Sequence, residues 1–287
     1  MKLSIITINY NNAEGLKRTL ASVTEQTYKQ IEHIIVDGGS TDGSLEVIKE
    51  YVSSNPDSDP FMKHVIKWVS EKDKGVYNAM NKGIIRATGS YIEILNSGDV
   101  LAAPEVTERM VKEVENAEYP SILYGNMLKS YDGKTIINRD TCGNGMYTPE
   151  SFLYFYKGTL NHDCAYIRRD LFDKYGLYNE EMKICSDWEW YVKAIALGEE
   201  KAVYTNVDVT IFDMNGVSES HGKNAELIKQ ERREYLEKVL PATILHDYDA
   251  FSFPILQYQR LKKHHLWGLV NFMERVLFKL ERWRVLK

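Results

Sequence analysis

Two apolar runs that stop abruptly in glycine and a carboxylate constrain the fold of this chain more than any other feature. Residues 91–95 lead into Asn-Ser-Gly-Asp at positions 96–99, and residues 34–36 lead into Asp-Gly-Gly at positions 37–39. Open α/β sheets bind ligands at the carboxyl ends of their parallel strands, and glycine lets the backbone approach a ligand closely. Two such endings, each after a helix-like segment, predict a site for a nucleotide and a metal ion.

The order of the segments predicts the fold class. Apolar runs of strand length alternate with segments of helical spacing four times in the first hundred residues. This alternation predicts an α/β fold with a mostly parallel sheet and helices on both faces. The later pattern predicts a helix from Pro104, a strand pair over residues 121–138 that turns at Asp132 and Gly133, and a loop over residues 141–158.

Composition narrows the class of protein. The net charge of −5 over 287 residues argues against broad nucleic-acid binding. Three cysteines, far apart and without a C-x-x-C pair, fit a reducing cytoplasm and neither a disulfide framework nor a zinc site. No apolar stretch approaches the ~20 residues that span a bilayer, so we expect a cytoplasmic protein.

The two strand-end aspartates suit different chemistry. Asp37 can accept a hydrogen bond from a base N–H or a ribose hydroxyl, and it can equally be a solvated turn residue. Asp99 offers the oxygen ligand that Mg²⁺ or Mn²⁺ prefers beside substrate phosphates. As the N-cap of the helix after Pro104 it would lie too far upstream. A third segment, Asp73 with Asn78, Asn81 and Lys82 one turn apart on the next helix, fits either a ligand site or a capped surface helix.

Taken together, these motifs resemble glycosyltransferase family 2, whose members have the nucleotide-binding GT-A fold. The resemblance covers roughly residues 1–220, and no single motif would carry it. It is carried by Asn-Tyr-Asn at 9–11, Val-Asp-Gly-Gly-Ser-Thr-Asp at 36–42, Asp-Lys-Gly at 73–75, Asn-Lys-Gly at 81–83 and Leu-Asn-Ser-Gly-Asp at 95–99.

The resemblance implies roles for these residues. Asp99 would hold a divalent metal, Mn²⁺ or Mg²⁺, on the donor diphosphate, next to Gly98. Gly98 and Gly38 depart from the pattern, because many family members carry aspartates at these two positions. The nucleoside of the donor, commonly uridine, would be bound by Ile8, Asn9, Tyr10, Asp37, Asp73 and Asn81.

The catalytic and acceptor residues are expected later in the chain. Ser-Asp-Trp-Glu-Trp at 186–190 resembles the family's acidic motif, and Asp187 would be the general base that takes the proton of an acceptor hydroxyl. Its alternative is a helix N-cap, and one residue can serve both roles. For the acceptor we expect contacts from His162, Trp188, Glu189 and Trp190, with core packing as the alternative for the histidine and the tryptophans. His221, in a loop that resembles one that closes over the donor, is a further metal ligand by the same resemblance.

The end of the chain is basic and amphipathic. Residues 260–287 carry eight Lys and Arg against two Glu, and apolar residues from Leu266 to Trp283 fall on one helical stripe. An anionic membrane surface, the protein's own domain and a second subunit of a homodimer remain open as what this stripe contacts. We therefore divide the chain into a donor half at 1–100, an acceptor and catalytic half at 101–225, and a helical extension at 226–287.

The resemblance, together with these observations, implies a metal-dependent, inverting glycosyltransferase. It would move one sugar from a nucleoside diphosphate sugar, commonly a UDP-sugar, to a glycan or lipid-linked acceptor in cell-surface polysaccharide synthesis. A nucleotidyltransferase is a weaker alternative, because residues 11–15 lack a glycine-rich, basic phosphate loop. A non-catalytic protein that binds sugar nucleotides or glycans is a second alternative, against which only Asp187 and the acceptor half argue.

Overall fold

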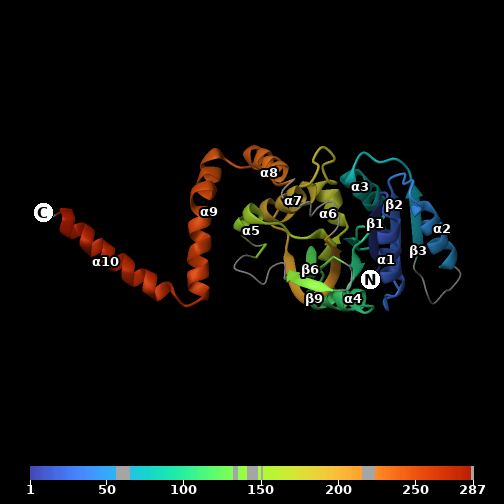
Figure 1. Ribbon diagram of the computed structural model, residues 1–287, viewed down its shortest axis with the longest axis horizontal. Coiled ribbons are helices and arrows are strands. Elements are labelled where there is room, and N and C mark those ends of the chain that lie inside the picture. The colour runs from blue at the N-terminus through green and yellow to red at the C-terminus, as the bar shows by residue number, and fades with distance from the viewer. Residues whose placement is uncertain (56–64, 132–134, 141–147, 150, 215–223, 286–287) are drawn as a thin grey trace. The chain divides into compact units, whose positions relative to one another are not determined.

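The computed structural model describes residues 1–55, 65–131, 135–140, 148–149, 151–214 and 224–285 (Figure 1). Contacts within the chain divide it into two units, Met1–Tyr235 and Leu236–Lys287. Among the described residues, nine strands form one sheet in the first unit. These are β1 (Leu3–Asn9), β2 (Ile31–Asp37), β3 (Val65–Ser70), β4 (Tyr91–Ile94), β5 (Val100–Leu101), β6 (Ile122–Ser130), β7 (Ile136–Asp140), β8 (Ala165–Arg168) and β9 (Ala202–Asp213).

Helices connect these strands and follow them. They are α1 (Ala13–Thr24), α2 (Ser44–Ser54), α3 (Val76–Arg86), α4 (Val106–Asn116), α5 (Phe152–Lys157), the 3₁₀ turn η1 (His162–Cys164), α6 (Asp170–Tyr175), α7 (Ser186–Tyr191) with its π-helical continuation η2 (Val192–Leu197), and α8 (Ala225–Val239).

The first four long strands confirm the predicted parallel sheet. They lie in the order β3-β2-β1-β4, and every pair in this run is parallel. All residues of β1 and β2 are buried, as expected for parallel strands covered on both faces.

The helices cover both faces of this parallel sheet. On one face α3 packs on β1 and β2, and a Cβ at Gly83 would collide with the side chain of Ile6. On the other face α1 and α2 pack together, and Leu16 and Ile48 join Ile35 of β2 in one apolar cluster. The alternating side chains of the strands therefore bury apolar residues on both sides.

The second half of the sheet is mixed. β8 lies antiparallel between β4 and β6, while β9 runs parallel to β6. The predicted strand pair is present as β6 and β7, and its turn at 132–134 lies outside the described residues. The loop predicted over 141–158 is wrong where α5 forms: Phe-Leu-Tyr-Phe-Tyr-Lys is too short and too uniformly aromatic to show a helical period.

The second unit consists of helices. Besides the end of α8 it contains α9 (Ala242–Lys263), which has Pro254 inside it, and α10 (Trp267–Val285). Large apolar side chains such as Leu269, Phe272 and Met273 are exposed on α10. Among the described residues, none of the helices combines the length and apolarity needed to cross a membrane.

Candidate active site

The sheet topology brings segments distant in sequence to one edge. β1, β2, β3 and β4 are parallel, so their carboxyl ends meet there. β8 is antiparallel to β4, and so η1 at the start of β8 lies beside the end of β4. β6 and β9 run in the direction of β4 and add their carboxyl ends to the same edge.

Asp37, at the end of β2, is fully buried and is the centre of a hydrogen-bond network. It accepts from Asn9 Nδ2 at 2.8 Å, Ser40 Oγ at 2.5 Å, Ser70 Oγ at 2.7 Å, and the backbone N–H groups of Gly39 and Ser40. Burial raises the pKa of Asp37, but these hydrogen bonds outweigh it and leave the pKa below its ordinary value. Asp37 therefore holds together the loops after β1, β2 and β3, which excludes the solvated-turn alternative.

The glycine at position 38 has a physical reason. A Cβ there would collide with the Asp73 carboxylate and press on the Tyr10 ring. Asp73 also accepts from the backbone N–H of Gly75 at 3.1 Å, at the start of α3. Tyr10 is 65% exposed. Gly38 thus lets Asp73 and an open aromatic face lie side by side at the end of β1, where a planar base could stack.

Two of the predicted donor residues have structural contacts within the protein. Ile8 is a buried core residue of β1. Asn81 is 3% exposed, and its amide donates to Tyr178 O at 2.9 Å and accepts from Tyr178 N at 3.0 Å. Asn81 therefore clamps the segment before α7 to α3, a role that its helical spacing alone did not reveal.

Asp99 lies among other acids. It is 4% exposed, and its Oδ1 accepts from the backbone N–H of Asp213 at 2.8 Å. Burial, then the nearby carboxylates of Asp163 and Asp213, raise the pKa of Asp99 well above its usual range. Asp213 is itself paired with Arg18 at 2.8 Å. Gly98 has φ of +112°, a backbone conformation that favours glycine.

The carboxylates around Asp99 would need further ligands from another molecule to hold a divalent cation. No group of three His, Cys, Asp or Glu ligands is assembled within the described residues. Mg²⁺ and Mn²⁺ nevertheless prefer carboxylate oxygens as ligands, and a bound cation would offset the repulsion between neighbouring carboxylates. Residue 221, predicted as a further ligand, lies outside the described residues.

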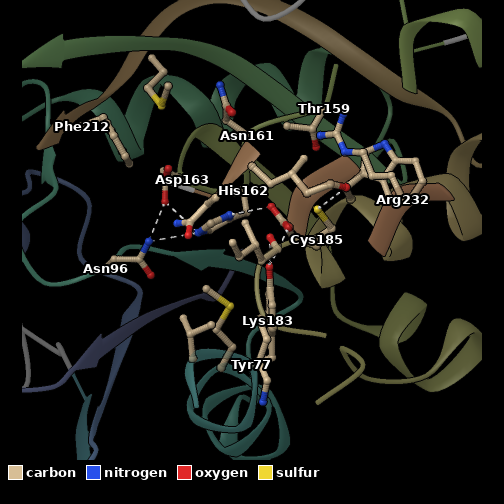
Figure 2. Close-up of a pocket in the computed structure, with 18 of the residues that line it drawn as sticks. Tyr77, Asn96, Thr159, Asn161, His162, Asp163, Lys183, Cys185, Phe212 and Arg232 are labelled. Atoms are coloured by element: carbon tan, nitrogen blue, oxygen red, sulfur yellow. Dashed lines mark hydrogen bonds and ion pairs between the residues drawn. The ribbon is translucent and has the colours of Figure 1, made fainter. Parts of the chain in front are cut away.

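Asp187 meets side chains from two other segments. Its Oδ2 lies 3.3 Å from His162 Nδ1, and its Oδ1 accepts from the Tyr77 hydroxyl at 3.0 Å. His162 Nε2 in turn lies 2.9 Å from Asp163 Oδ1, and the Asn96 amide lies within 3.2 Å of both. These contacts form a chain from the end of β4 to the start of α7 (Figure 2).

The two acids around His162 set its charge. Burial lowers the pKa of His162, but Asp163 and then Asp187 outweigh burial and raise it well above the usual value. Burial raises the pKa of Asp187, and the hydrogen bond and charge of His162 reverse this to a pKa below the ordinary value. Asp187 is therefore held as a carboxylate beside an imidazolium, and its side chain keeps 14% exposure.

A cavity of about 320 Å³ opens in front of this chain of contacts (Figure 2). Asp187, His162 and Tyr77 form one part of its wall, and Thr159 and Arg232 also line it. The rest of the wall is mainly apolar and includes Val76, Met80, Met127, Ile184, Phe212 and Ile228. This combination of an apolar wall with a few polar groups is typical of small-molecule sites.

Comparison with known proteins identifies the chain. The sequence profile described as Glycosyl transferase family 2 matches residues 4–176. The chain belongs to glycosyltransferase family 2. An uncharacterised glycosyltransferase of Mycobacterium tuberculosis is 30% identical over 232 residues, covering 80% of this chain and 82% of that protein. A PGL/p-HBAD biosynthesis glycosyltransferase of Mycobacterium bovis is 27% identical, covering 74% of this chain and 77% of that one.

Solved structures confirm the fold of this family 2 glycosyltransferase. S. aureus TarS 1–349 in complex with UDP-GlcNAc has a TM-score of 0.58 at 17% identity, over 74% of this chain and 58% of that chain. A mannosyltransferase from Pyrobaculum calidifontis in complex with GDP-Man and Mn²⁺ has a TM-score of 0.57 at 19% identity, over 93% and 72%. Both are GT-A-like α/β structures, in agreement with the predicted fold class. The family model and the named relatives give the enzyme class as glycosyltransferase and not nucleotidyltransferase.

The acidic motif of the glycosyltransferase divides between site and core. Trp188 lines the cavity, and its Nε1 donates to Phe155 O at 2.8 Å. Trp190 is 1% exposed and stacks on Phe172 at 4.7 Å, so the structure places it in the core and not against an acceptor. Glu189 points to Asn179 at 3.1 Å, away from the cavity lining. In a helix, positions 188, 189 and 190 face different directions, which explains why one of three contacts the cavity.

Three residues of the site were not predicted from the sequence. Tyr77 and Asp163 hold Asp187 and His162, and neither lies at an obvious strand end. Glu231 of α8 accepts from the backbone N–H groups of Lys183 at 2.6 Å, Ile184 at 3.1 Å and Cys185 at 3.0 Å. It thereby fixes the segment that presents Asp187, from a position more than forty residues away. The pairing of a helix start with a distant acid leaves no local pattern in the sequence.

Proposed function

We propose that this enzyme is an inverting glycosyltransferase that transfers one sugar from a UDP-sugar to a hydroxyl group of a glycan or lipid-linked acceptor. The donor proposal is supported by the exposed Tyr10 ring beside Asp73 at the ends of the parallel strands. It is also supported by the similarity in fold to a structure that contains UDP-GlcNAc.

We place a divalent metal, Mn²⁺ or Mg²⁺, on the donor diphosphate beside Asp99. The buried acids around Asp99 support this position, and one solved structure of similar fold contains Mn²⁺. When bound, such a cation offsets the negative charge that develops on the leaving nucleoside diphosphate. Asp99 would hold it directly, and Arg18 would keep Asp213 in place beside it.

The observation that carries the proposed reaction is the position of Asp187. It is a carboxylate that faces the cavity, held by Tyr77 and His162 on its two oxygens and kept ionised by the histidine. It would take the proton of the acceptor hydroxyl as the acceptor oxygen forms its bond to the anomeric carbon and the bond from that carbon to the diphosphate oxygen breaks. Attack on the face opposite the leaving group inverts the anomeric carbon.

The class of acceptor and the location at a membrane are proposed from less direct observations. The Mycobacterium bovis relative is named for PGL/p-HBAD biosynthesis, which supports a glycan or glycolipid acceptor in cell-surface synthesis. The exposed apolar side chains of α10 and the basic charge of residues 260–287 support peripheral contact with an anionic membrane at its cytoplasmic face. A homodimer through the same helices is the alternative, and sedimentation with and without anionic vesicles separates the two.

The test is nucleoside diphosphate release from a panel of UDP-, GDP- and dTDP-sugars, with and without Mn²⁺, in the presence of lipid extract as acceptor. We expect release from one UDP-sugar that depends on both metal and acceptor. Release from a GDP- or dTDP-sugar instead would contradict the UDP proposal. Release that persists undiminished with chelator would contradict the metal proposal and leave the transferase in place.

A further inference from the structure

Arg232 is a cation at the cavity that the proposed reaction does not use. It comes from α8, and its guanidinium carbon lies 5.0 Å from the centre of the Trp188 ring. Trp188 is itself fixed, because it is 1% exposed and its indole N–H is bonded to Phe155 O. The guanidinium is therefore held in place by a cation–π contact on a rigid ring.

The acidic side chains near Arg232 already have other hydrogen-bond partners. Glu231, its neighbour in sequence, accepts from three backbone N–H groups. Asp187 is paired with His162 and Tyr77. Within the parts of the chain that the structure describes, no ion pair to Arg232 forms, and its buried Nε meets no hydrogen-bond partner. The Cys185 thiol that interacts with Arg232 stays neutral, because burial raises its pKa to about 12. Burying part of a charged guanidinium costs free energy when its N–H groups have no acceptor. An anion that accepts from them offsets this cost.

The cavity has a second, weaker source of positive charge. Lys129, at the carboxyl end of β6, also lines it. Lys183 lines it too, but its side chain runs away from the His162 cluster (Figure 2). The planar guanidinium of Arg232 is thus the group suited to bidentate recognition of an oxyanion.

We propose that Arg232 on Trp188 forms a subsite for an anionic group of the acceptor, a carboxylate or a phosphoryl group, while the acceptor hydroxyl faces Asp187. This inference rests on the proposed function, because it names the class of acceptor that enters the same cavity. The apolar wall between the two ends would contact the sugar ring and any attached apolar group.

The test uses the full chain with UDP and Mn²⁺ and measures the affinity of three probes by calorimetry: glucuronate, glucose 1-phosphate and neutral glucose. We expect at least one anionic probe to bind about tenfold or more tightly than glucose, the difference that one charged hydrogen bond provides. The stronger of the two anionic probes distinguishes a carboxylate from a phosphoryl group. Equal binding of all three, or no binding of any, contradicts the proposal.

Variants locate the effect. Arg232→Met keeps an apolar stem on Trp188 and should bring the anionic probes to the level of glucose, and Arg232→Lys should recover part of the preference. Arg233→Met, the same change one position along α8 and outside the cavity lining, should leave the preference intact. Anion binding that survives Arg232→Met overturns the proposal. If that variant does not fold, Arg232→Lys decides: a reduced preference supports the proposal, because an ammonium cannot replace the two parallel hydrogen bonds of a guanidinium, and an undiminished preference overturns it.

UDP binding separates this inference from the proposed function. The affinity of the wild type for UDP with Mn²⁺ tests the donor site alone, and its absence would count against the proposed function. UDP affinity that falls markedly in Arg232→Met would place the guanidinium on the donor diphosphate and overturn the acceptor subsite. Unchanged UDP affinity with lost anion preference is the expected result.

Discussion

The donor and acceptor sides of the site are built in different ways. On the donor side, Asp37 joins the ends of three neighbouring strands, and all its partners lie within the first seventy residues. On the acceptor side, Asp187 depends on Tyr77, on His162 and, through its backbone segment, on Glu231. One half is made of short motifs and the other of single residues that the fold brings together from far apart. In the site that we propose, the nucleotide side is therefore built from local motifs, whereas the surroundings of Asp187 are not.

The largest effect is expected from removing the charge of the acceptor-side base. Asp187→Asn should lower kcat by about 10²- to 10⁴-fold, the contribution of a positioned general base, because the amide cannot take the acceptor proton. Affinity for UDP with Mn²⁺ should stay within about twofold, since the donor half is built independently. Steady-state kinetics and calorimetry measure the two, with the exposed Asp173→Asn as the control. Full activity in Asp187→Asn would remove the residue from catalysis.

This division also marks what the sequence could predict. The role of Asp187 as the base stays a prediction. The parallel strands and the aspartates at their ends were predictable because apolar period, glycine and carboxylate occur together over a few residues. The role of Asn81 as a clamp on Tyr178 was not, because its partner lies almost a hundred residues away. The aromatic residues at 188 and 190 look alike in sequence, and only packing against Phe172 places one of them in the core. Pairing between distant segments is decided by sheet order, which a local pattern does not contain.

The stability of the protein should depend on pH through a buried acid where β4 meets β8. Glu93 of β4 is fully buried where β4 meets β8, and burial, opposed by the Tyr166 hydroxyl and reinforced by Asp163, raises its pKa to about 8. The folded protein keeps a proton that the unfolded chain, with a pKa near 4.5, has lost. Stability from this group is therefore complete below that value and falls as pH rises toward 8, by about 1.4 kcal/mol per pH unit.

Glu93→Gln should remove this slope, because the amide imitates the protonated acid. Urea unfolding at pH 5 to 9 would show a flatter profile for the variant, with its largest advantage over the wild type, about 3 kcal/mol or more, at pH 8 to 9. The exposed Glu50→Gln serves as the control and should keep the wild-type slope. Parallel profiles for wild type and Glu93→Gln would show that Glu93 is ionised in the folded protein.

A smaller effect should be confined to the donor side. Asp99→Asn should weaken UDP binding in the presence of Mn²⁺ by at least about tenfold, since even partners outside the ligand shell cost this much in metal affinity. Binding of UDP without metal should change little. Calorimetry with Mn²⁺ and with chelator gives both values, and Asp140→Asn on β7 is the control. If UDP affinity depends neither on metal nor on Asp99, the proposed metal site at Asp99 is wrong.

The smallest expected effect tests whether the acceptor side acts as one unit. The hydrogen bond and charge of His162 lower the pKa of Asp187 against burial, which raises it. His162→Gln removes the charge, so the pKa of Asp187 should rise, and the base should need a higher pH to be ionised. The acid limb of the kcat profile should therefore move to higher pH, while KM for the donor stays unchanged because Asp37 and its partners are untouched. An unmoved acid limb with lower kcat at every pH would mean that His162 contacts the acceptor and does not set the charge of the base.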